Sequence, residues 1–363
     1  MNNIYKRKVA LITVILTVFT SCNSDLEVNA PYKDIAIVYG LLNQADSTHY
    51  IKINKAFLGQ ADANNMAKIP DSSDYGDILD VNIVETKRPA SQGVNRSFTL
   101  QRTLITGKEA GMFYSPDQYV YKFETLSGEP LSGDAKYELY IKNKNTEKEI
   151  TSQTEMVNDF SIKEPKANSG SDAQFWTKVS FVNLNKYNEY KIKWISAKDA
   201  RRYNVVMSFN YIEEDINGIK TDKKVEWKFS DIKSKSAVGG EEMEISILSE
   251  AFYSKIGNEV AINSSVKNRI IKGLDFNITA AGEELNIYME VNEPATGIVQ
   301  EKPEYTNITN GIGIFSCRYN KDVKGKLMTS NTTEELVTAT IGGYTSSRSF
   351  CDESPGSNYP CKQ

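Results

Sequence analysis

The residue types that most often carry catalysis or bind metals are scarce in this chain of 363 residues, which has one His and four Cys. The single histidine, His49, excludes a metal site built from several histidines, and we interpret it as a structural residue near the start of a strand. No CxxC pair is present, so neither a zinc ribbon nor a thioredoxin-like site is expected. The sequence also lacks the common phosphate-binding, dinucleotide-binding, zinc-protease and serine-hydrolase motifs. We therefore predict a non-enzyme with no catalytic, cofactor-binding or metal-binding residues.

Cys22 has the clearest predicted role among the cysteines. It follows three basic residues at positions 6–8 and an apolar run of 11 residues from Val9 to Phe19. Crossing a bilayer takes about 20 apolar residues, so this run is too short to span and has the proportions of a secretory signal. The ending Phe-Thr-Ser-Cys resembles the lipobox of bacterial lipoproteins, in which the signal peptide is removed before the cysteine and the thiol is lipidated. The alternative is an ordinary secretory signal followed by an unmodified cysteine.

This resemblance implies the organisation of the N-terminus. Residues 1–21 would be a lipoprotein signal peptide, Cys22 would carry acyl chains such as palmitate, and residues 22–33 would form a lipidated tether. Several acyl chains anchor a protein stably where one chain is marginal. Two acids lie within residues 23–27, and this short acidic cluster resembles the surface-export signal of Bacteroidetes-type lipoproteins. We expect lipid anchoring in the outer membrane, with display at the cell surface favoured over the periplasmic face.

Three further cysteines remain in the exported chain: Cys317, Cys351 and Cys361. An exported protein folds in an oxidising compartment, where disulfides form and persist. Cys351 and Cys361 enclose a short, turn-rich loop and are the preferred disulfide candidates. Closing such a loop contributes about 3 kcal/mol in the chain-entropy treatment and would pin a cysteine-containing tail at residues 351–363. Cys317 is then a free thiol, or the alternative partner of either other cysteine.

Charge and composition exclude one class of partner and favour one class of fold. The chain has 47 acidic and 43 basic residues, which gives a net charge of −4. Nucleic-acid binding relies on a clear basic surplus, so we predict no nucleic-acid partner. Tyrosine is abundant, at 20 residues, and aromatic residues favour strands. A mainly β protein is therefore expected.

Alternating apolar and polar residues predict the strands of a first domain. Residues 50–57, 78–85 and 135–142 alternate with a period of two, which is typical of half-buried strands. Short strands at spacings near ten residues favour a β-sandwich, so residues 34–161 are predicted to form an N-terminal β-sandwich. Residues 58–78 contain Pro, Gly and several Asp, and are predicted to be a long loop.

A second domain is predicted beyond a linker at residues 162–173, which are rich in small polar residues and contain Pro and Gly. A strand ending at Trp194, an Ala-x-x-Ala corner and a strand opening at Tyr203 resemble fibronectin type III domains. Residues 249–274 change to helical spacing, which predicts one helix or two short ones. The expected fold is therefore two immunoglobulin- or fibronectin III-like β-sandwiches. The second would occupy residues 174–350 and carry a short helical insertion near 249–274.

Two sequence blocks suggest a family. The blocks "VYGLLN…HYIKINKAF" and "PEYTNITNGIGIF", together with the lipobox, resemble Bacteroidetes-type outer-membrane or surface lipoproteins that share a domain of unknown function. The resemblance implies a lipoprotein that accompanies TonB-dependent outer-membrane receptors, and it carries over no catalytic residues. In the second block, Asn310-Gly311 and Gly313 predict a turn entering a strand whose backbone packs closely against its neighbour.

These observations lead to three functional hypotheses. The first is a non-enzymatic binding or accessory subunit of a surface uptake system, whose partner would be a TonB-dependent receptor and whose small ligand or glycan the sequence does not identify. The second is a surface adhesin or structural lipoprotein, and the third is a hydrolase with two facing carboxylates about 5–9 Å apart. The loop at 58–78 is the predicted contact region, with Met66, Ile69 and Tyr75 as apolar anchors in a polar rim.

Overall fold

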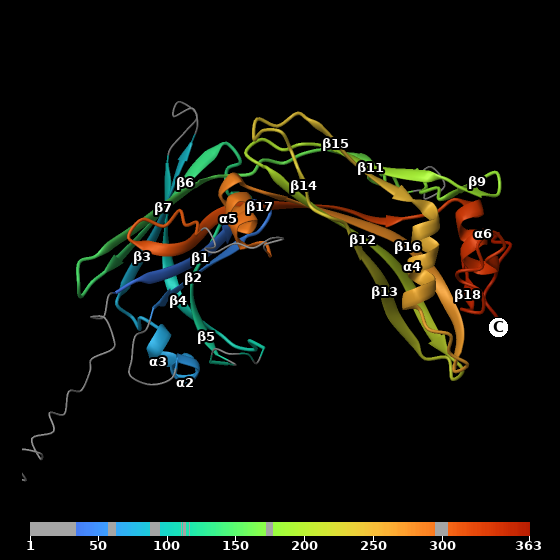
Figure 1. The fold of residues 1–363 in the computed structure, drawn as a ribbon, viewed down its shortest axis with the longest axis horizontal. Helices are drawn as coiled ribbons and strands as arrows, with labels where there is room; N and C mark the ends of the chain where they lie inside the picture. Colours follow the sequence, from blue (N-terminus) through green and yellow to red (C-terminus); the bar gives the residue numbers. More distant parts are fainter. Residues whose placement is uncertain are drawn as a thin grey trace, which may run out of the picture.

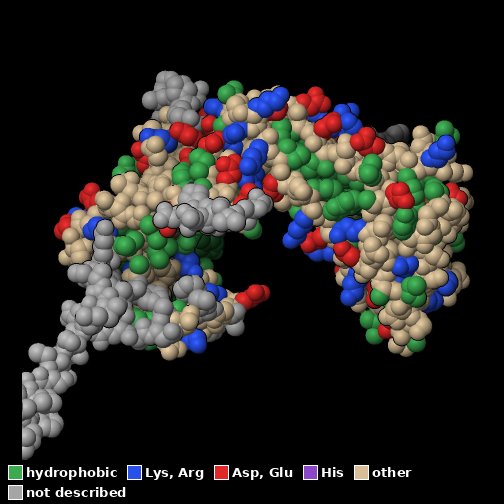
Figure 2. All heavy atoms as spheres, viewed as in Figure 1, with side chains coloured by type: hydrophobic (Ala, Val, Ile, Leu, Met, Phe, Trp, Pro, Cys, Tyr) green, Lys and Arg blue, Asp and Glu red, His purple; other side chains and the backbone are tan. Residues whose placement is uncertain are grey.

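Strands dominate the structure and form two lobes joined by long strands (Figure 1). The space below these connecting strands is open in the space-filling view (Figure 2). None of the described helices is long and apolar enough to span a bilayer. The protein is represented by a computed structural model, which describes residues 34–56, 63–87, 95–109, 111, 114–115, 117–171, 177–294 and 304–363.

The first lobe contains seven strands in two groups. One group has the order β1-β2-β5-β4 and the other has the order β4-β3-β6-β7, because β4 takes part in both. The first half of β4 pairs with β3 and its second half pairs with β5. The strands are β1 (Ala36–Leu42), β2 (Thr48–Lys55), β3 (Leu79–Lys87), β4 (Arg96–Ile105), β5 (Gln118–Glu124), β6 (Ala135–Asn143) and β7 (Glu149–Glu155).

Alternation explains why these segments form strands with one buried face. In β3, Val81 and Ile83 are buried while Asp80 is exposed. In β6, Leu139 and Ile141 are buried opposite them, since Ile83 pairs with Leu139 and Val81 with Ile141. These side chains belong to a continuous apolar core, whose burial is the main stabilising contribution.

The second lobe also has two layers. One layer has the order β13-β12-β16 and continues into β17, while the other has the order β15-β11-β8. Trp194 of β11 is fully buried, and its ring lies 5.7 Å from that of Tyr203 in β12, so the two layers pack face to face. The main strands are β8 (Ile162–Glu164), β11 (Glu189–Ile195), β12 (Arg202–Asp215), β13 (Lys220–Lys228), β15 (Glu242–Leu248), β16 (Val266–Ala281) and β17 (Gly311–Lys326).

Short strands and three helices complete the second lobe and the junction. Helix α4 packs on the sheet through Phe252, whose ring lies 5.9 Å from that of Phe209 in β12. The helices are α4 (Ser249–Glu259), α5 (Glu283–Asn292) and α6 (Ser330–Thr338). The short strands are β9 (Val182–Asn183), β10 (Lys186–Tyr187), β14 (Ile232–Lys233) and β18 (Phe350–Cys351).

Strand β17 belongs to both lobes. Residues 311–317 run parallel to β1, and residues 318–326 run antiparallel to β16. Gly313 permits the first pairing, because its φ is +113° and a Cβ at this position would collide with the carbonyl of Val38. Asn310 also has a positive φ, of 60°. The predicted turn and close-packed strand at this point are therefore confirmed.

Part of the predicted linker forms a strand in the structure. Residues 162–164 of the predicted linker form β8, which pairs with β11, because Ile162 packs against the apolar core. Residues 172–173 lie outside the described part of the chain. Moreover, the strands of 34–161 are not closed on themselves, since β17 from the predicted second domain supplies the neighbour of β1.

The predicted helix near 249–274 is correct only for its first part. Residues 249–259 form α4, but residues 266–281 form the long strand β16. The register with β12 shifts so that Gly273 and Ile271 face successive β12 residues, which leaves Lys272 as an extra residue. Such a bulge interrupts the period of two, and this explains why the apolar residues mimic helical spacing.

The long loop expected at 58–78 contains two short helices in its described part, α2 (Ala63–Ala67) and α3 (Pro70–Ser73). Ile69 is 51% exposed, as an anchor residue would be. Tyr75 is instead buried, and its hydroxyl donates a hydrogen bond to Asp34 Oδ1 at 2.6 Å. Tyr75 therefore belongs to the core of the first lobe, not to an exposed contact surface.

Candidate functional site

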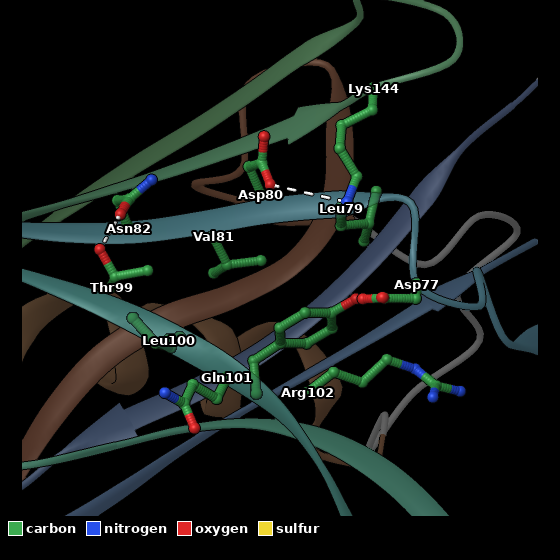
Figure 3. A pocket seen from close by; sticks show the side chains of 11 residues that line it. Asp77, Leu79, Asp80, Val81, Asn82, Thr99, Leu100, Gln101, Arg102 and Lys144 are labelled. Carbon is green, nitrogen blue, oxygen red and sulfur yellow. Dashed lines mark hydrogen bonds and ion pairs between the residues drawn. The ribbon is translucent and has the colours of Figure 1, made fainter.

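A polar cleft opens where β3 separates from β4 in the first lobe (Figure 3). Pairing between the two strands stops at Val81 and Leu100, after which β4 pairs with β5 instead. The two strands diverge from this point, and we call the space between them the fork cleft. It has a volume of about 660 Å³. Its lining residues are Asp77, Leu79, Asp80, Val81, Asn82, Thr99, Leu100, Gln101, Arg102, Tyr121 and Lys144.

The floor of the fork cleft is apolar, whereas its rim is polar. Leu79, Val81 and Leu100 are buried core residues. At the rim, Thr99 donates a hydrogen bond to Asn82 Oδ1 at 2.8 Å, and Lys144 lies 3.8 Å from Asp80 (Figure 3). This ion pair is exposed, as are Thr99 and Gln101, so these rim side chains are accessible to a ligand.

The charged side chain of Arg102 lies on the same face of β4 as the buried Leu100. Its guanidinium pairs with Asp74, which follows α3, and lies 3.2 Å from the centre of the Tyr119 ring. The ion pair and the cation–π contact fix the position of the side chain. Its Nε is buried and has no hydrogen-bond partner among the described residues.

Tyr121 lies directly opposite Arg102 in the pairing of β4 with β5. It is only 4% exposed, and its hydroxyl is buried without a hydrogen-bond partner in the described parts of the chain. Burial raises the pKa of Tyr121 to about 12, and the carboxylates of Asp74, Asp77 and Asp80 add to this effect while Arg102 opposes it. At neutral pH the phenol is therefore protonated and acts as a hydrogen-bond donor.

The described side chains of the fork cleft offer hydrogen-bonding groups and balanced charges. The lining charges balance, because Asp77 and Asp80 face Arg102 and Lys144. Tyr121 is protonated, so it is a poor nucleophile. Among the residues that the structure describes, no group of three or more His, Cys, Asp or Glu side chains is arranged to hold a metal ion.

A second buried polar cluster in the first lobe is fully satisfied. The carboxylate of Glu85 accepts two hydrogen bonds from Arg96, at 2.9 and 2.6 Å, and one from the Tyr137 hydroxyl at 2.6 Å. Burial alone would raise the pKa of Glu85, but the hydrogen bonds from Arg96, Tyr137 and the Ser132 amide outweigh burial and lower it. Because every group in this cluster has a partner, its role is structural.

Cys317 lies at the junction of the lobes. It is fully buried, its thiol donates to the Glu155 carbonyl at 2.7 Å, and its sulfur accepts from the Val157 amide at 3.2 Å. Burial raises the pKa of the thiol to about 12. A protonated and inaccessible thiol is unreactive, so Cys317 packs the junction.

Glu284, beside Cys317, is the described carboxyl that most resembles a catalytic acid. Burial raises its pKa, and Glu155 adds to the effect. Its Oε2 accepts hydrogen bonds from Thr154 at 3.1 Å and Ser316 at 3.2 Å. Glu283 and Glu284 are neighbours in the sequence, and α5 holds Glu284 against β7 and β17. It does not line the fork cleft.

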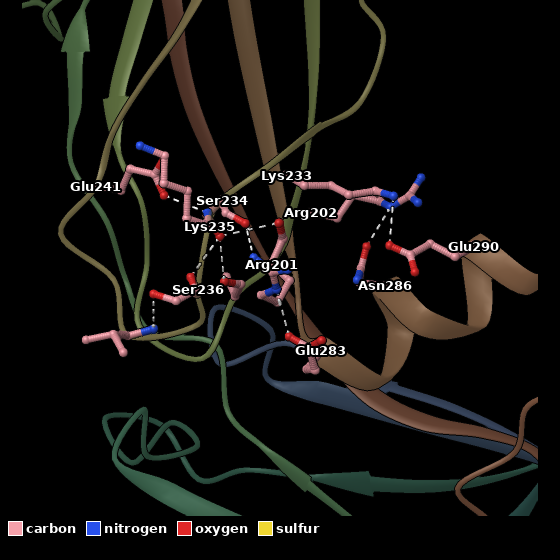
Figure 4. A network of polar contacts seen from close by, with 12 residues as sticks. Arg201, Arg202, Lys233, Ser234, Lys235, Ser236, Glu241, Glu283, Asn286 and Glu290 are labelled. Atoms are coloured by element: carbon pink, nitrogen blue, oxygen red, sulfur yellow. Dashed lines mark hydrogen bonds and ion pairs between the residues drawn. The ribbon is translucent and has the colours of Figure 1, made fainter.

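Arginines fasten α5 to the second lobe (Figure 4). The buried Arg202 donates to Asn286 Oδ1 at 3.1 Å and pairs with Asp231 at 2.9 Å. Arg201 pairs with Glu283 at 3.0 Å. These contacts join the start of β12 to α5 and position the junction, so this network is also structural.

The remaining predicted residues take the following positions. Cys22 lies outside the described residues. Cys351 and Cys361 form a disulfide, and Cys317 is free. His49 is buried in β2, where its ring stacks on Phe123 at 4.7 Å and burial lowers its pKa.

Sequence reasoning missed the fork cleft, although one signal was present. Phe98, Leu100 and Arg102 alternate on one face of β4, and Arg102 is charged whereas Phe98 and Leu100 pack into the core. A charge in an apolar stripe indicates either a buried ion pair or a site. The predicted contact region at 58–78 overlaps the fork cleft in part, because Asp77 lines the cleft and Asp74 pairs with Arg102.

Comparisons with known proteins add little. No family model matches the chain, and no curated protein matches it. One similar solved structure is the C-terminal globular domain of an oligosaccharyltransferase from Pyrococcus abyssi, with 9% identity, a TM-score of 0.21, and coverage of 68% of this chain and 47% of that chain. Another is the calcium-binding domain CBD12 of CALX1.1, with 9% identity, a TM-score of 0.17, and coverage of 78% and 98%. The chain thus matches about half the length of the oligosaccharyltransferase domain, and likeness at these TM-scores carries no argument.

Proposed function

We propose that this protein is a non-enzymatic, lipid-anchored binding protein of the outer membrane that recognises its ligand at the fork cleft. The single observation that carries the proposal is the pair of buried donors, Tyr121 Oη and Arg102 Nε, that have no partner among the described residues. A buried donor without a partner costs about 1–3 kcal/mol, and these two are the unpartnered donors of the described residues that line the fork cleft. A ligand that accepts these hydrogen bonds would offset this cost.

Features around the cleft support binding over hydrolysis. A glycosidase needs two carboxyl groups at a defined separation, one of them protonated. In the cleft, Asp80 is partnered by Lys144, and Asp74 beside it is partnered by Arg102. Glu284, whose pKa is raised, lies elsewhere. The hydrolase hypothesis therefore has no support at this site.

The adhesin hypothesis is disfavoured by the edge of the long sheet. Assembly by strand addition needs an open edge strand. One of the two edges of this sheet, opposite β7, is β13, which carries Lys220, Lys223, Lys224 and Lys228. Lysines along an edge oppose pairing with another chain, so this edge is protected.

Attachment to the membrane is part of the proposal and rests on the lipobox at Cys22. The resemblance to Bacteroidetes-type lipoproteins supports display at the cell surface, as a partner of a TonB-dependent receptor. The proposed arrangement is two sandwich-like lobes on a tether of residues 22–33, with the fork cleft carried by the first lobe. In that lobe, β1 starts shortly after the tether ends.

Cys22→Ala tests the anchor. We expect the variant to lose incorporation of a fatty-acid analogue and to appear in the soluble fraction, because the lipid is the proposed membrane attachment. Cys317→Ala serves as the control, since its thiol is buried and should not affect labelling. Undiminished labelling of Cys22→Ala would contradict lipidation at this residue.

Ligand binding and turnover are tested together on a soluble form that begins at residue 23. The form is incubated with a panel of oligosaccharides, polysaccharides and peptides, and both the melting temperature and the products are measured. A ligand that binds the folded state raises the melting temperature. We expect at least one panel member to do so and to be recovered unchanged. Conversion of any member to products would overturn the non-enzyme proposal.

A further inference from the structure

We propose that the ligand of the fork cleft is a neutral, hydroxyl-rich chain, specifically a short neutral oligosaccharide, one of whose oxygens accepts hydrogen bonds from Tyr121 and Arg102. This inference rests on the proposed function and names the chemical class of its ligand. The buried donors, the charges and the lining of the cleft each support this ligand class.

The buried donors require an oxygen acceptor. Tyr121 and Arg102 are direct neighbours across β4 and β5, so the side chains that carry the unpartnered Oη and Nε start from facing positions on adjacent strands. Arg102 is held in place by Asp74 and the Tyr119 ring, so it cannot easily turn away. A ligand oxygen at this point would satisfy two donors that are already in position, which lowers the entropy cost of binding.

The surrounding charges leave no excess of positive charge to attract an anionic acceptor. The positive charge of Arg102 is already neutralised by Asp74. Asp77 and Asp80 also line the cleft, and together these carboxylates act on Tyr121 strongly enough to add to its raised pKa. Because Arg102 is paired with Asp74 and Lys144 lies beside Asp80, neither cation of the lining is left unpaired to attract a carboxylate or phosphate, whereas a hydroxyl or ether oxygen needs no such charge.

The lining of the cleft favours a sugar over a peptide. Seven of its eleven lining residues are polar or charged. The amides of Asn82 and Gln101 each donate and accept, which matches sugar hydroxyls that do the same. The floor of Leu79, Val81 and Leu100 suits the C–H face of a sugar ring. Peptide grooves instead provide apolar pockets for alternate side chains, and this lining offers none at its rim.

The test uses isothermal titration of the soluble form with defined probes. The neutral probes are maltohexaose, cellohexaose, mannohexaose and xylohexaose. A hexagalacturonate serves as the anionic comparator, and an acetylated, amidated hexapeptide serves as the peptide comparator. We expect at least one neutral hexaose to bind at least about tenfold more tightly than either comparator, a difference of 1.4 kcal/mol.

Two matched Tyr→Phe variants show where the probe binds. Tyr121→Phe removes only the free hydroxyl, and we expect it to weaken the neutral hexaose about tenfold. Tyr137→Phe removes a hydroxyl in the same lobe that is bonded to Glu85, away from the fork cleft, and should leave affinity within about twofold. Gln101→Ala, at the exposed rim, should weaken binding about threefold without affecting the fold.

The outcomes separate this inference from the proposed function. If the peptide or the galacturonate binds more tightly and depends on Tyr121, the neutral-sugar inference is overturned while the fork cleft remains a binding site. If a hexaose binds equally well to Tyr121→Phe and wild type, the assigned acceptor position is wrong and the inference is overturned. If no probe and no member of the wider panel depends on Tyr121, both the inference and the proposed function fail.

Discussion

The two lobes differ in how they treat buried tyrosine hydroxyls. In the second lobe, the Tyr203 hydroxyl accepts the amide of Ala197 at 2.7 Å, and the Tyr253 hydroxyl donates to the Thr332 carbonyl at 3.1 Å. In the first lobe, Tyr137 is bonded to Glu85, but Tyr121 has no partner in the described residues. Of these four tyrosines, Tyr121 is the one whose hydroxyl is bonded by no described residue, and it is also the one that lines the fork cleft.

The two lobes also differ at their ends, since one end is closed and the other is open. The second lobe closes its far end with α6 and the disulfide between Cys351 and Cys361, and the tail is held where the Asn268 side chain bonds both the N–H and the carbonyl of Lys362. The first lobe leaves its strands to diverge at the fork cleft. We infer that the second lobe is built for stability and the first for recognition.

Loss of Glu85 has the largest expected effect on stability. Glu85→Ala leaves Arg96 and Tyr137 without their partner, and removing one partner of a buried pair costs about 3–5 kcal/mol. Urea unfolding at pH 7 measures the loss. As a control from the second lobe, Glu244→Ala breaks an exposed pair with Lys191 and should change stability little. Equal losses in the two variants would contradict a structural role for Glu85.

The Glu85 carboxylate also makes the stability of the protein depend on pH. The pKa of Glu85 is lowered in the folded protein from an ordinary value of 4.5, so its contribution is present above that pH and is lost as the pH falls through the folded value. The stability difference between wild type and Glu85→Gln should therefore narrow in acid. If the difference in unfolding free energy between the two proteins stays constant from pH 7 to pH 3, the pKa of Glu85 is not lowered in the folded protein.

Removal of the disulfide tests the stability of the second lobe. Replacing Cys351 and Cys361 with Ser opens a loop with a sequence separation of 10. We expect a loss of about 3 kcal/mol, because the unfolded chain gains freedom when the loop opens. Ligand binding at the fork cleft should be unchanged, as measured by titration. Weakened binding would show that the disulfide of the second lobe influences the fork cleft in the first lobe.

Cys317 reports whether the lobes separate. Its buried thiol has a pKa raised to about 12, so we expect it to react with a thiol reagent at pH 8 at least about a hundredfold more slowly in the native state than in urea. The junction must open before the reagent reaches it. Rapid reaction under native conditions would show that β17 does not hold the lobes together.

Part of this fold could be predicted from local sequence. Alternation identified the strands around Val81 and Leu139, and the turn-rich spacing identified Cys351 with Cys361. The turn at Asp215-Ile-Asn-Gly218 is likewise held by local contacts, since Asp215 Oδ1 accepts the amides of Asn217 and Ile219 at 2.8 Å. These features depend on neighbouring residues, which one sequence displays directly.

Long-range features could not be predicted in the same way. The division of β17 between two lobes depends on pairing with β1, nearly the whole chain away, and no local pattern encodes that partner. The bulge at Lys272 changed the apparent period of β16. The fork cleft depends on β4 changing partners between Leu100 and Gln101, so that its lining residues come from separate strands. Only the charge of Arg102 in an apolar stripe marked the place.

The most direct test compares the unfolding free energies of Tyr121→Phe and Tyr137→Phe with wild type, in urea and without ligand. Tyr137→Phe should lose about 1–3 kcal/mol, because the Glu85 carboxylate loses a donor. Tyr121→Phe should be unchanged or more stable by up to about 1 kcal/mol, because it removes a buried hydroxyl that has no partner in the described residues. If Tyr121→Phe is destabilised as much as Tyr137→Phe, the hydroxyl has a structural partner and is not held for a ligand.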